Sequence, residues 1–128
     1  MVESADKHES FEVVIKEGWI EKRSKYVKEW RPRWLVLTPR FLCSFKKQQD
    51  YRSSPTEKIT LRECSSVKSA EDDVRRADSF RVDTNVRTYF FTARDTAEKE
   101  AWIGAIGKIM VTPSVLRTHS EEEMMDGQ

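Results

Sequence analysis

The chain has 128 residues, of which 38% are hydrophobic and 35% are charged, and its formal net charge is +1. This size and balance predict one soluble globular domain with an ordinary hydrophobic core, and they exclude a disordered or fibrous chain. No apolar run approaches the roughly 20 residues that a membrane-spanning helix needs, so we expect no transmembrane segment.

The charge is unevenly distributed along the chain. Residues 16–62 contain 13 Lys or Arg and 5 Asp or Glu, a net charge of +8, whereas residues 1–15 carry −3 and residues 63–128 carry −4. A polarised field of this kind orients a protein toward an anionic partner. Solvated surface charge alone would explain scattered cations well but explains this local excess poorly.

Most of the chain alternates between short β-rich runs and turn material. Residues 1–14 lack any periodicity and predict a flexible N-terminal arm. We expect seven strands, at residues 15–24, 32–38, 41–47, 57–62, 65–69, 79–84 and 87–93. The segment 48–55 has no apolar pattern and predicts a longer loop.

The hydrophobic period changes near the end of the chain. Asp95 suits a helix N-cap, with Glu98 three residues on as in a capping box. An apolar face with helical spacing follows at Trp102, Ala105, Ile106 and Ile109. Pro113 predicts that this helix, of about 16 residues, ends before it. Residues 112–128 are then expected to form a flexible acidic tail.

Few residues suggest catalysis or metal binding. Cys43 and Cys64 form no pattern and predict free thiols in a cytosolic protein, although a disulfide is possible. The two histidines, His8 and His119, lie in the predicted tails, so no metal-ligand spacing is present. No nucleophile, phosphate-loop or paired-histidine motif appears, and we expect neither an enzyme nor a cofactor.

Two segments in the first half carry a specific pattern. Lys16–Arg23 (KEGWIEKR) resembles the first strand of pleckstrin-homology (PH) domains, whose common form is E-G-W-L-x-K, and Trp30–Leu37 (WRPRWLVL) resembles the second. Together Lys22, Arg31 and Arg33 match the phosphoinositide signature K-x(n)-(K/R)-x-R, with n equal to eight. Later elements follow the family pattern in order, at Phe41–Phe45, Lys58–Leu61, Ser79–Val82, Tyr89–Ala93 and Glu100–Ile103.

The resemblance covers residues 15–111 and implies a mainly β fold. The expected architecture is a PH-like seven-stranded barrel or sandwich of two near-orthogonal antiparallel sheets, capped by one C-terminal α-helix. It also implies a basic open end that binds a lipid headgroup. Strand alternation supports this pocket, because it places Lys22 on the face of Ile20, and both arginines on the face of Leu35.

Other residues of the basic half surround this predicted pocket. Further headgroup-binding residues are expected at Lys25, Lys28 and Lys58. Tyr26 and Val27, on the loop after the first strand, are expected to contact the membrane interface, with ordinary loop packing as the alternative. Accessory attraction to an anionic surface is expected from Arg23, Lys46, Lys47 and Arg52. The alternative for these cations is solvated surface charge.

The resulting hypothesis is a membrane-targeting module that binds anionic phospholipid headgroups. We expect a cytoplasmic monomer, recruited peripherally to membranes, with phosphoinositides or phosphatidic acid as ligands. Ser44 and the short segment 83–87 favour a general anionic-lipid sensor over a selective clamp. The alternative is a PH-fold protein-interaction module with weak or no lipid specificity. Nucleic acid is not expected, because the basic patch is compact and the pI is about 7.8.

Overall fold

The structure, a computed structural model, describes residues 13–126, with the side chains of residues 13–111. The first four strands are β1 (Lys16–Arg23), β2 (Trp30–Leu37), β3 (Phe41–Phe45) and β4 (Glu57–Thr60). The remaining strands are β5 (Cys64–Ser69), β6 (Ser79–Thr84) and β7 (Thr88–Thr92). The helical elements are η1 (Leu61–Glu63), α2 (Glu71–Val74) and α3 (Thr96–Asp126). The seven predicted strands and the C-terminal helix are confirmed, whereas the short turns η1 and α2 were not predicted.

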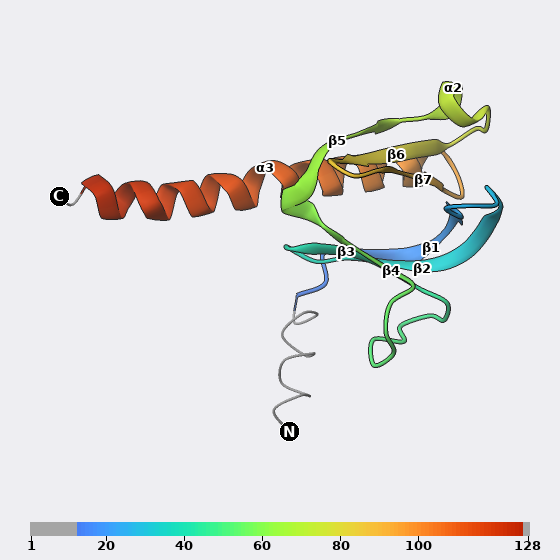
Figure 1. The fold of residues 1–128 in the computed structure, drawn as a ribbon, viewed down its shortest axis with the longest axis horizontal. Helices are drawn as coiled ribbons and strands as arrows, with labels where there is room; N and C mark the ends of the chain where they lie inside the picture. The colour runs from blue at the N-terminus through green and yellow to red at the C-terminus, as the bar shows by residue number, and fades with distance from the viewer. Residues whose placement is uncertain (1–12, 127–128) are drawn as a thin grey trace.

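The strands form one antiparallel sheet in the order β4-β3-β2-β1-β7-β6-β5. β1 pairs with β2 along its whole length but with β7 only at Glu21 and Lys22. At this short pairing the sheet turns from one layer to the other, so that β1–β4 and β5–β7 face each other (Figure 1). β4 and β5 form the two edges of the sheet and do not pair with each other, so the barrel is not closed. The PH-like architecture expected from the sequence is confirmed in this open form.

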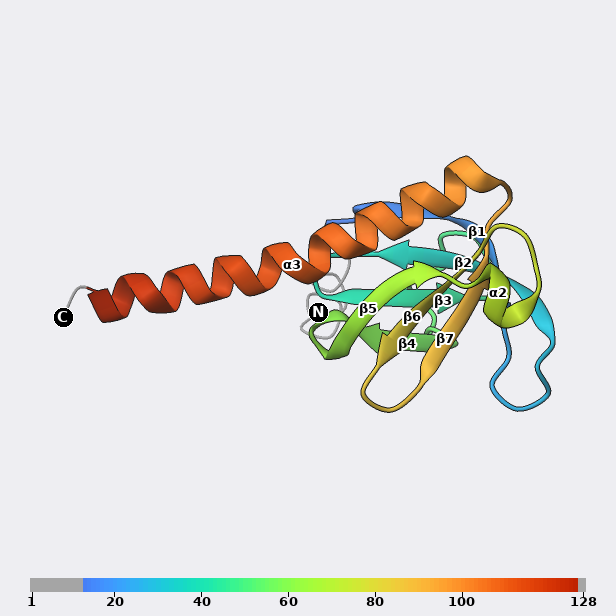
Figure 2. The ribbon, with the colours of Figure 1, turned by 90° about the horizontal axis from the view of Figure 1, so that it is seen from above.

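The main core fills the space between the two layers. Phe80 and Phe91 stack at a centroid distance of 5.2 Å, and both are fully buried. The first turns of α3 lie along the side of the sandwich and contribute the buried face expected from its periodicity (Figure 2). The buried residues of that face are Trp102, Ile106 and Ile109. The Asp95 cap is also confirmed, because the Glu98 backbone N–H donates to its Oδ1 at 2.8 Å.

The end of α3 differs from the sequence-based expectation. The helix continues through Pro113 to Asp126 and extends beyond the strands (Figure 1). An interior proline costs about 3 kcal/mol because it lacks an N–H donor and crowds the preceding turn. The residues after it, however, include strong helix formers such as Leu116, Arg117 and Glu121. The predicted end before Pro113 is therefore wrong for the backbone, and the expected flexibility of this segment stays a prediction. Residues 1–12 of the predicted arm lie outside the described residues.

A second cluster covers the outer face of β2 and β3. It consists of the buried side chains of Trp34, Val36, Cys43 and Phe45. Tyr51, from the β3–β4 connection, packs against Phe45 at a ring distance of 6.1 Å, and its hydroxyl donates to Glu17. The Trp34 indole N–H donates to the same carboxylate at 2.9 Å. These contacts fasten the β3–β4 connection to the outside of the sheet.

The two cysteines are free, as predicted. Burial raises the pKa of the Cys43 thiol to about 11, and it is also the main reason that the pKa of Cys64 lies at about 11. Both thiols are therefore protonated and unreactive near neutral pH.

Trp102 is the largest fully buried side chain, and its truncation tests the role of α3. We expect Trp102→Ala to lower the free energy of unfolding by about 3–5 kcal/mol, because it opens a large cavity. Trp102→Phe should cost markedly less, since the indole Nε1 has no hydrogen-bond partner among the described residues. Chemical denaturation measures both losses. An alanine variant as stable as the wild type would contradict the assignment of Trp102 to the core.

Tyr51 makes the docking of the β3–β4 connection sensitive to high pH. Burial, followed by the hydrogen bond to Glu17, raises the pKa of its hydroxyl from the usual value near 10 to about 12. The unfolded chain therefore ionises first, and the free energy of unfolding should fall as the pH rises from about 10 to about 12. Denaturation at several pH values should show a shallower fall for Tyr51→Phe. Parallel curves would show that Tyr51 has no such role.

Candidate functional site

The β1–β2 hairpin brings the three signature cations together. Lys22 lies opposite Arg31, and Ile20 lies opposite Arg33, in the antiparallel register. The side chains surround a hollow of about 140 Å³, which we call the first hollow. Its lining residues are Lys22, Ser24, Lys25, Arg31, Arg33 and Thr56. Four of the six predicted headgroup-binding residues therefore line one hollow.

Two of the signature cations already have carboxylate partners. The Lys22 ammonium lies 2.7 Å from Glu57 Oε1, and the Arg31 guanidinium lies 3.1 Å from Glu29 Oε1. Neither ion pair was predicted from the sequence. Glu29 precedes Arg31 by two residues, but Glu57 reaches the site from β4, and only the folded sheet brings it near.

Arg33 differs from the other two signature cations. Its guanidinium donates to the backbone oxygen of Pro32 at 2.8 Å, and no carboxylate of the described residues lies within ion-pair distance. Burial and then the positive charge of Arg31 lower the pKa of Arg33. An anion seated between the two arginines would relieve this repulsion. Among the three signature cations, Arg33 is thus the one without a carboxylate partner in the described residues.

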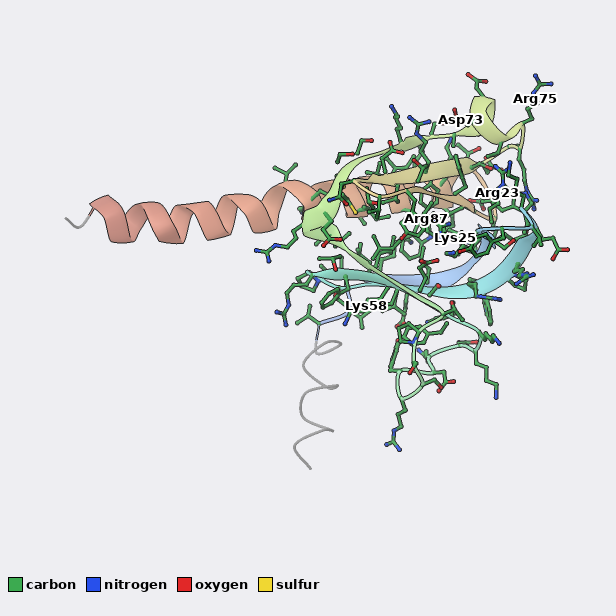
Figure 3. All side chains as sticks on the ribbon, viewed as in Figure 1. Arg23, Lys25, Lys58, Asp73, Arg75 and Arg87 are labelled. Atoms are coloured by element: carbon green, nitrogen blue, oxygen red, sulfur yellow. The ribbon has the colours of Figure 1, made fainter. Side chains whose placement is uncertain are left out.

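A second basic hollow lies on the other side of the β1–β2 loop. Its volume is about 340 Å³, and its lining residues are Arg23, Ser24, Lys25, Lys28, Arg87, Thr88 and Phe90. Figure 3 shows Arg23, Lys25 and Arg87 gathered toward this end of the sandwich. Arg87 was missed in the sequence because it follows the β6 strand, far from the signature. Its guanidinium lies 4.3 Å from the Tyr89 ring centre.

The β1–β2 loop is closed at its base and exposed at its tip. The Ser24 backbone N–H donates to Glu29 O at 2.7 Å, and the Glu29 N–H donates to the Ser24 hydroxyl at 3.0 Å. Tyr26 is 83% exposed and Val27 is 60% exposed, so neither side chain is packed into the protein. The loop-packing alternative for Tyr26 and Val27 is therefore not supported.

The structure does not bring Lys58 to the first hollow. Along β4, Glu57 and Ile59 face the interior, and alternation turns Lys58 to the outer face, where its ammonium lies 4.1 Å from the Phe41 ring centre. Figure 3 shows Lys58 apart from Lys25 and Arg87. The predicted placement of Lys58 in the pocket is therefore wrong.

The three remaining cations that were predicted to add accessory attraction lie on the β3–β4 connection. Lys46, Lys47 and Arg52 are exposed and line neither hollow. Their contribution to attraction stays a prediction. Beside this connection, the buried Ser44 hydroxyl lies 2.6 Å from that of Thr56, which separates it from the first hollow.

The described residues contain no group of three His, Cys, Asp or Glu side chains that could hold a metal ion. Among the same residues, no helix is both long enough and apolar enough to span a membrane.

Comparison with known proteins identifies the fold family. The PH domain model matches residues 14–111. The Pleckstrin homology domain-containing protein 1 of Arabidopsis thaliana is 38% identical over 112 residues, which is 85% of this chain and 76% of that protein. The human Pleckstrin homology domain-containing family A member 6 is 35% identical over 97 residues, which is 74% of this chain and only 9% of that protein.

Two solved domains resemble the structure and were crystallised with anionic ligands. The C-terminal PH domain of pleckstrin, in complex with an inositol pentakisphosphate, is 29% identical, with a TM-score of 0.62 over 76% of this chain and 98% of that one. The PH domain of Slm1, in complex with phosphoserine, is 27% identical, with a TM-score of 0.64 over 76% and 95%. A further structure of the Slm1 domain concerns ligand binding outside its usual site.

Proposed function

The chain belongs to the PH domain family, and from this premise we propose that it binds anionic phospholipid headgroups through the first hollow. The observation that carries the proposal is Arg33, which has no carboxylate partner in the described residues and lines the same hollow as Arg31 and the buried Lys22. Arginine binds phosphate oxygens through a planar fork, and lysine adds a compact point charge. Phosphate is therefore the ligand group that fits this arrangement.

The solved relatives support a phosphate-bearing ligand. The pleckstrin domain holds an inositol phosphate and the Slm1 domain holds phosphoserine, so phosphate is common to both ligands. We extend this to phosphoinositides and to phosphatidic acid. Because Ser44 is buried beneath Thr56 and cannot reach a ligand, broad recognition of anionic headgroups is favoured over one isomer.

The second hollow gives a further place for an anion. It presents Arg23, Lys25, Lys28 and Arg87. The Slm1 structure with its ligand outside the usual site supports the use of two places in domains of this fold. We therefore include Arg23, Lys25 and Lys28 in the membrane-facing surface, together with Arg87.

Exposed apolar side chains at two loop tips support attachment to a bilayer surface. Tyr26 and Val27 lie on the β1–β2 loop, and Val86, which is 79% exposed, lies on the β6–β7 turn. Both loops extend in the same direction from the strands (Figure 2). Apolar and aromatic tips between cations suit the interface between headgroups and acyl chains.

In this proposal the chain is a binding module without catalysis, a monomer, and a cytoplasmic protein recruited peripherally to membranes in signalling. The alternative is a protein-interaction module. The unpaired outer edges of β4 and β5 favour this alternative, because an extended peptide can pair with an open edge.

Arg33→Ala tests the proposed headgroup site directly. We expect its binding to phosphoinositide vesicles to fall about tenfold or more, because it removes a charge-assisted bond worth roughly 1.5–3 kcal/mol. Vesicle co-sedimentation measures the change. Lys58→Ala removes the same charge from the outer face and should bind nearly as the wild type does. Equal losses in the two variants, or none in Arg33→Ala, would favour the protein-interaction alternative.

The loop tip is tested by the double change Tyr26→Ser and Val27→Ser. We expect vesicle binding to weaken about tenfold, because burial of these side chains in the interface is lost. Affinity for a soluble inositol phosphate should stay the same, since the tip lines neither hollow. Val111→Ser, at an exposed position on α3, serves as the control. A double variant that binds vesicles normally would show that the tip stays in water.

A further inference from the structure

Glu57 places a carboxylate beside Lys22, one of the cations that line the first hollow. Glu57 begins β4 and lies opposite Ser44 in the register, facing the interior of the sandwich. Its Oε1 lies 2.7 Å from the Lys22 ammonium, and its Oε2 lies 3.9 Å from the Arg87 guanidinium. One acidic side chain therefore contacts a cation of each hollow. Its negative charge also acts on Tyr89, whose pKa is raised first by burial and then by Glu57.

The two ion pairs of the first hollow differ in their exposure to water. The Lys22 side chain is 10% exposed and Glu57 is 25% exposed, whereas Arg31 and Glu29 are 47% and 65% exposed. Solvent and salt screen the outer pair strongly, so an arriving anion displaces Glu29 easily. The inner Lys22–Glu57 pair is poorly screened, so a ligand can bind Lys22 only by displacing Glu57.

We infer that Glu57 competes with the headgroup for Lys22 and thereby determines which anions can bind Lys22. The inference rests on the proposed function and concerns selectivity within it. A headgroup with one phosphate is held by Arg31 and Arg33 and leaves the inner pair intact. A phosphoinositide headgroup with several ring phosphates places a second phosphate at Lys22 and displaces Glu57. The carboxylate thus discriminates by the number of phosphates that a headgroup carries.

The test compares Glu57→Gln with the wild type on two kinds of vesicle. One kind contains phosphatidylinositol bisphosphate in phosphatidylcholine, and the other contains phosphatidylserine at the same total negative charge. Glutamine keeps the shape of the side chain and removes its charge. We expect affinity for the bisphosphate vesicles to rise about tenfold, and affinity for the phosphatidylserine vesicles to rise much less. Titration with soluble inositol trisphosphate, in the absence of a bilayer, should show the same gain in affinity, because the effect lies in headgroup binding.

Glu29→Gln is the matched control, because it also removes one negative charge beside the first hollow and frees the exposed Arg31. Its gain should be small and similar on both kinds of vesicle. Glu57→Asp provides a second variant if loss of the charge unfolds the protein, which thermal unfolding would detect. Aspartate keeps the charge but is one methylene shorter, so its contact with Lys22 loosens, and about a two- to threefold gain on bisphosphate vesicles is expected.

The outcomes separate this inference from the proposed function. If Arg33→Ala loses binding but the Glu57 variants gain no more than Glu29→Gln, the inference is overturned and the headgroup site stands. A Glu57→Gln gain of equal size on both kinds of vesicle also overturns it, because selectivity would be unaffected. If neither the wild type nor Glu57→Gln binds any anionic vesicle, both the inference and the proposed function fall.

Discussion

The whole arrangement depends on the double pairing of β1. This strand pairs with β2 along its length and with β7 only at Glu21 and Lys22, so it belongs to both layers of the sandwich. The sheet turns at this short pairing, and the turn lets the two layers enclose the main apolar core. At the turn Lys22 is nearly buried, which a lysine tolerates only beside a carboxylate. The geometry that closes the core therefore also creates the charged site.

At this site, carboxylates form ion pairs with two of the three signature cations. Lys22 is paired with Glu57, Arg31 with Glu29, and Arg33 with no carboxylate of the described residues. A count of basic residues overstates the charge that is available to a ligand. In the proposed function, the exposed arginines would hold an arriving anion first, and the buried lysine would bind it only after its ion pair with Glu57 is broken. In this proposal, affinity and selectivity would arise from different residues around one hollow.

Local patterns in the sequence predicted the strands, the Asp95 cap and the meeting of Lys22 with Arg31, because alternation and hairpin register act over few residues. Glu57 and Arg87 could not be predicted as members of the site, since their positions depend on how the layers face each other. Lys58 lies outside the pocket because alternation along β4 turns it to the outer face, and no face had been assigned to this residue from the sequence. Pro113 was given too much weight against the helix-forming residues that follow it.

The β1–β2 loop is a common wall between the two hollows, and Lys25 lines both. One ammonium group can neutralise one phosphate at a time. A headgroup that captures Lys25 on either side leaves the other hollow with one cation fewer. If both hollows bind anions, as proposed, the two anions would compete for Lys25, and the second would be held more weakly than the first. In the proposed function, binding to an anionic leaflet would then saturate in two steps of unequal affinity.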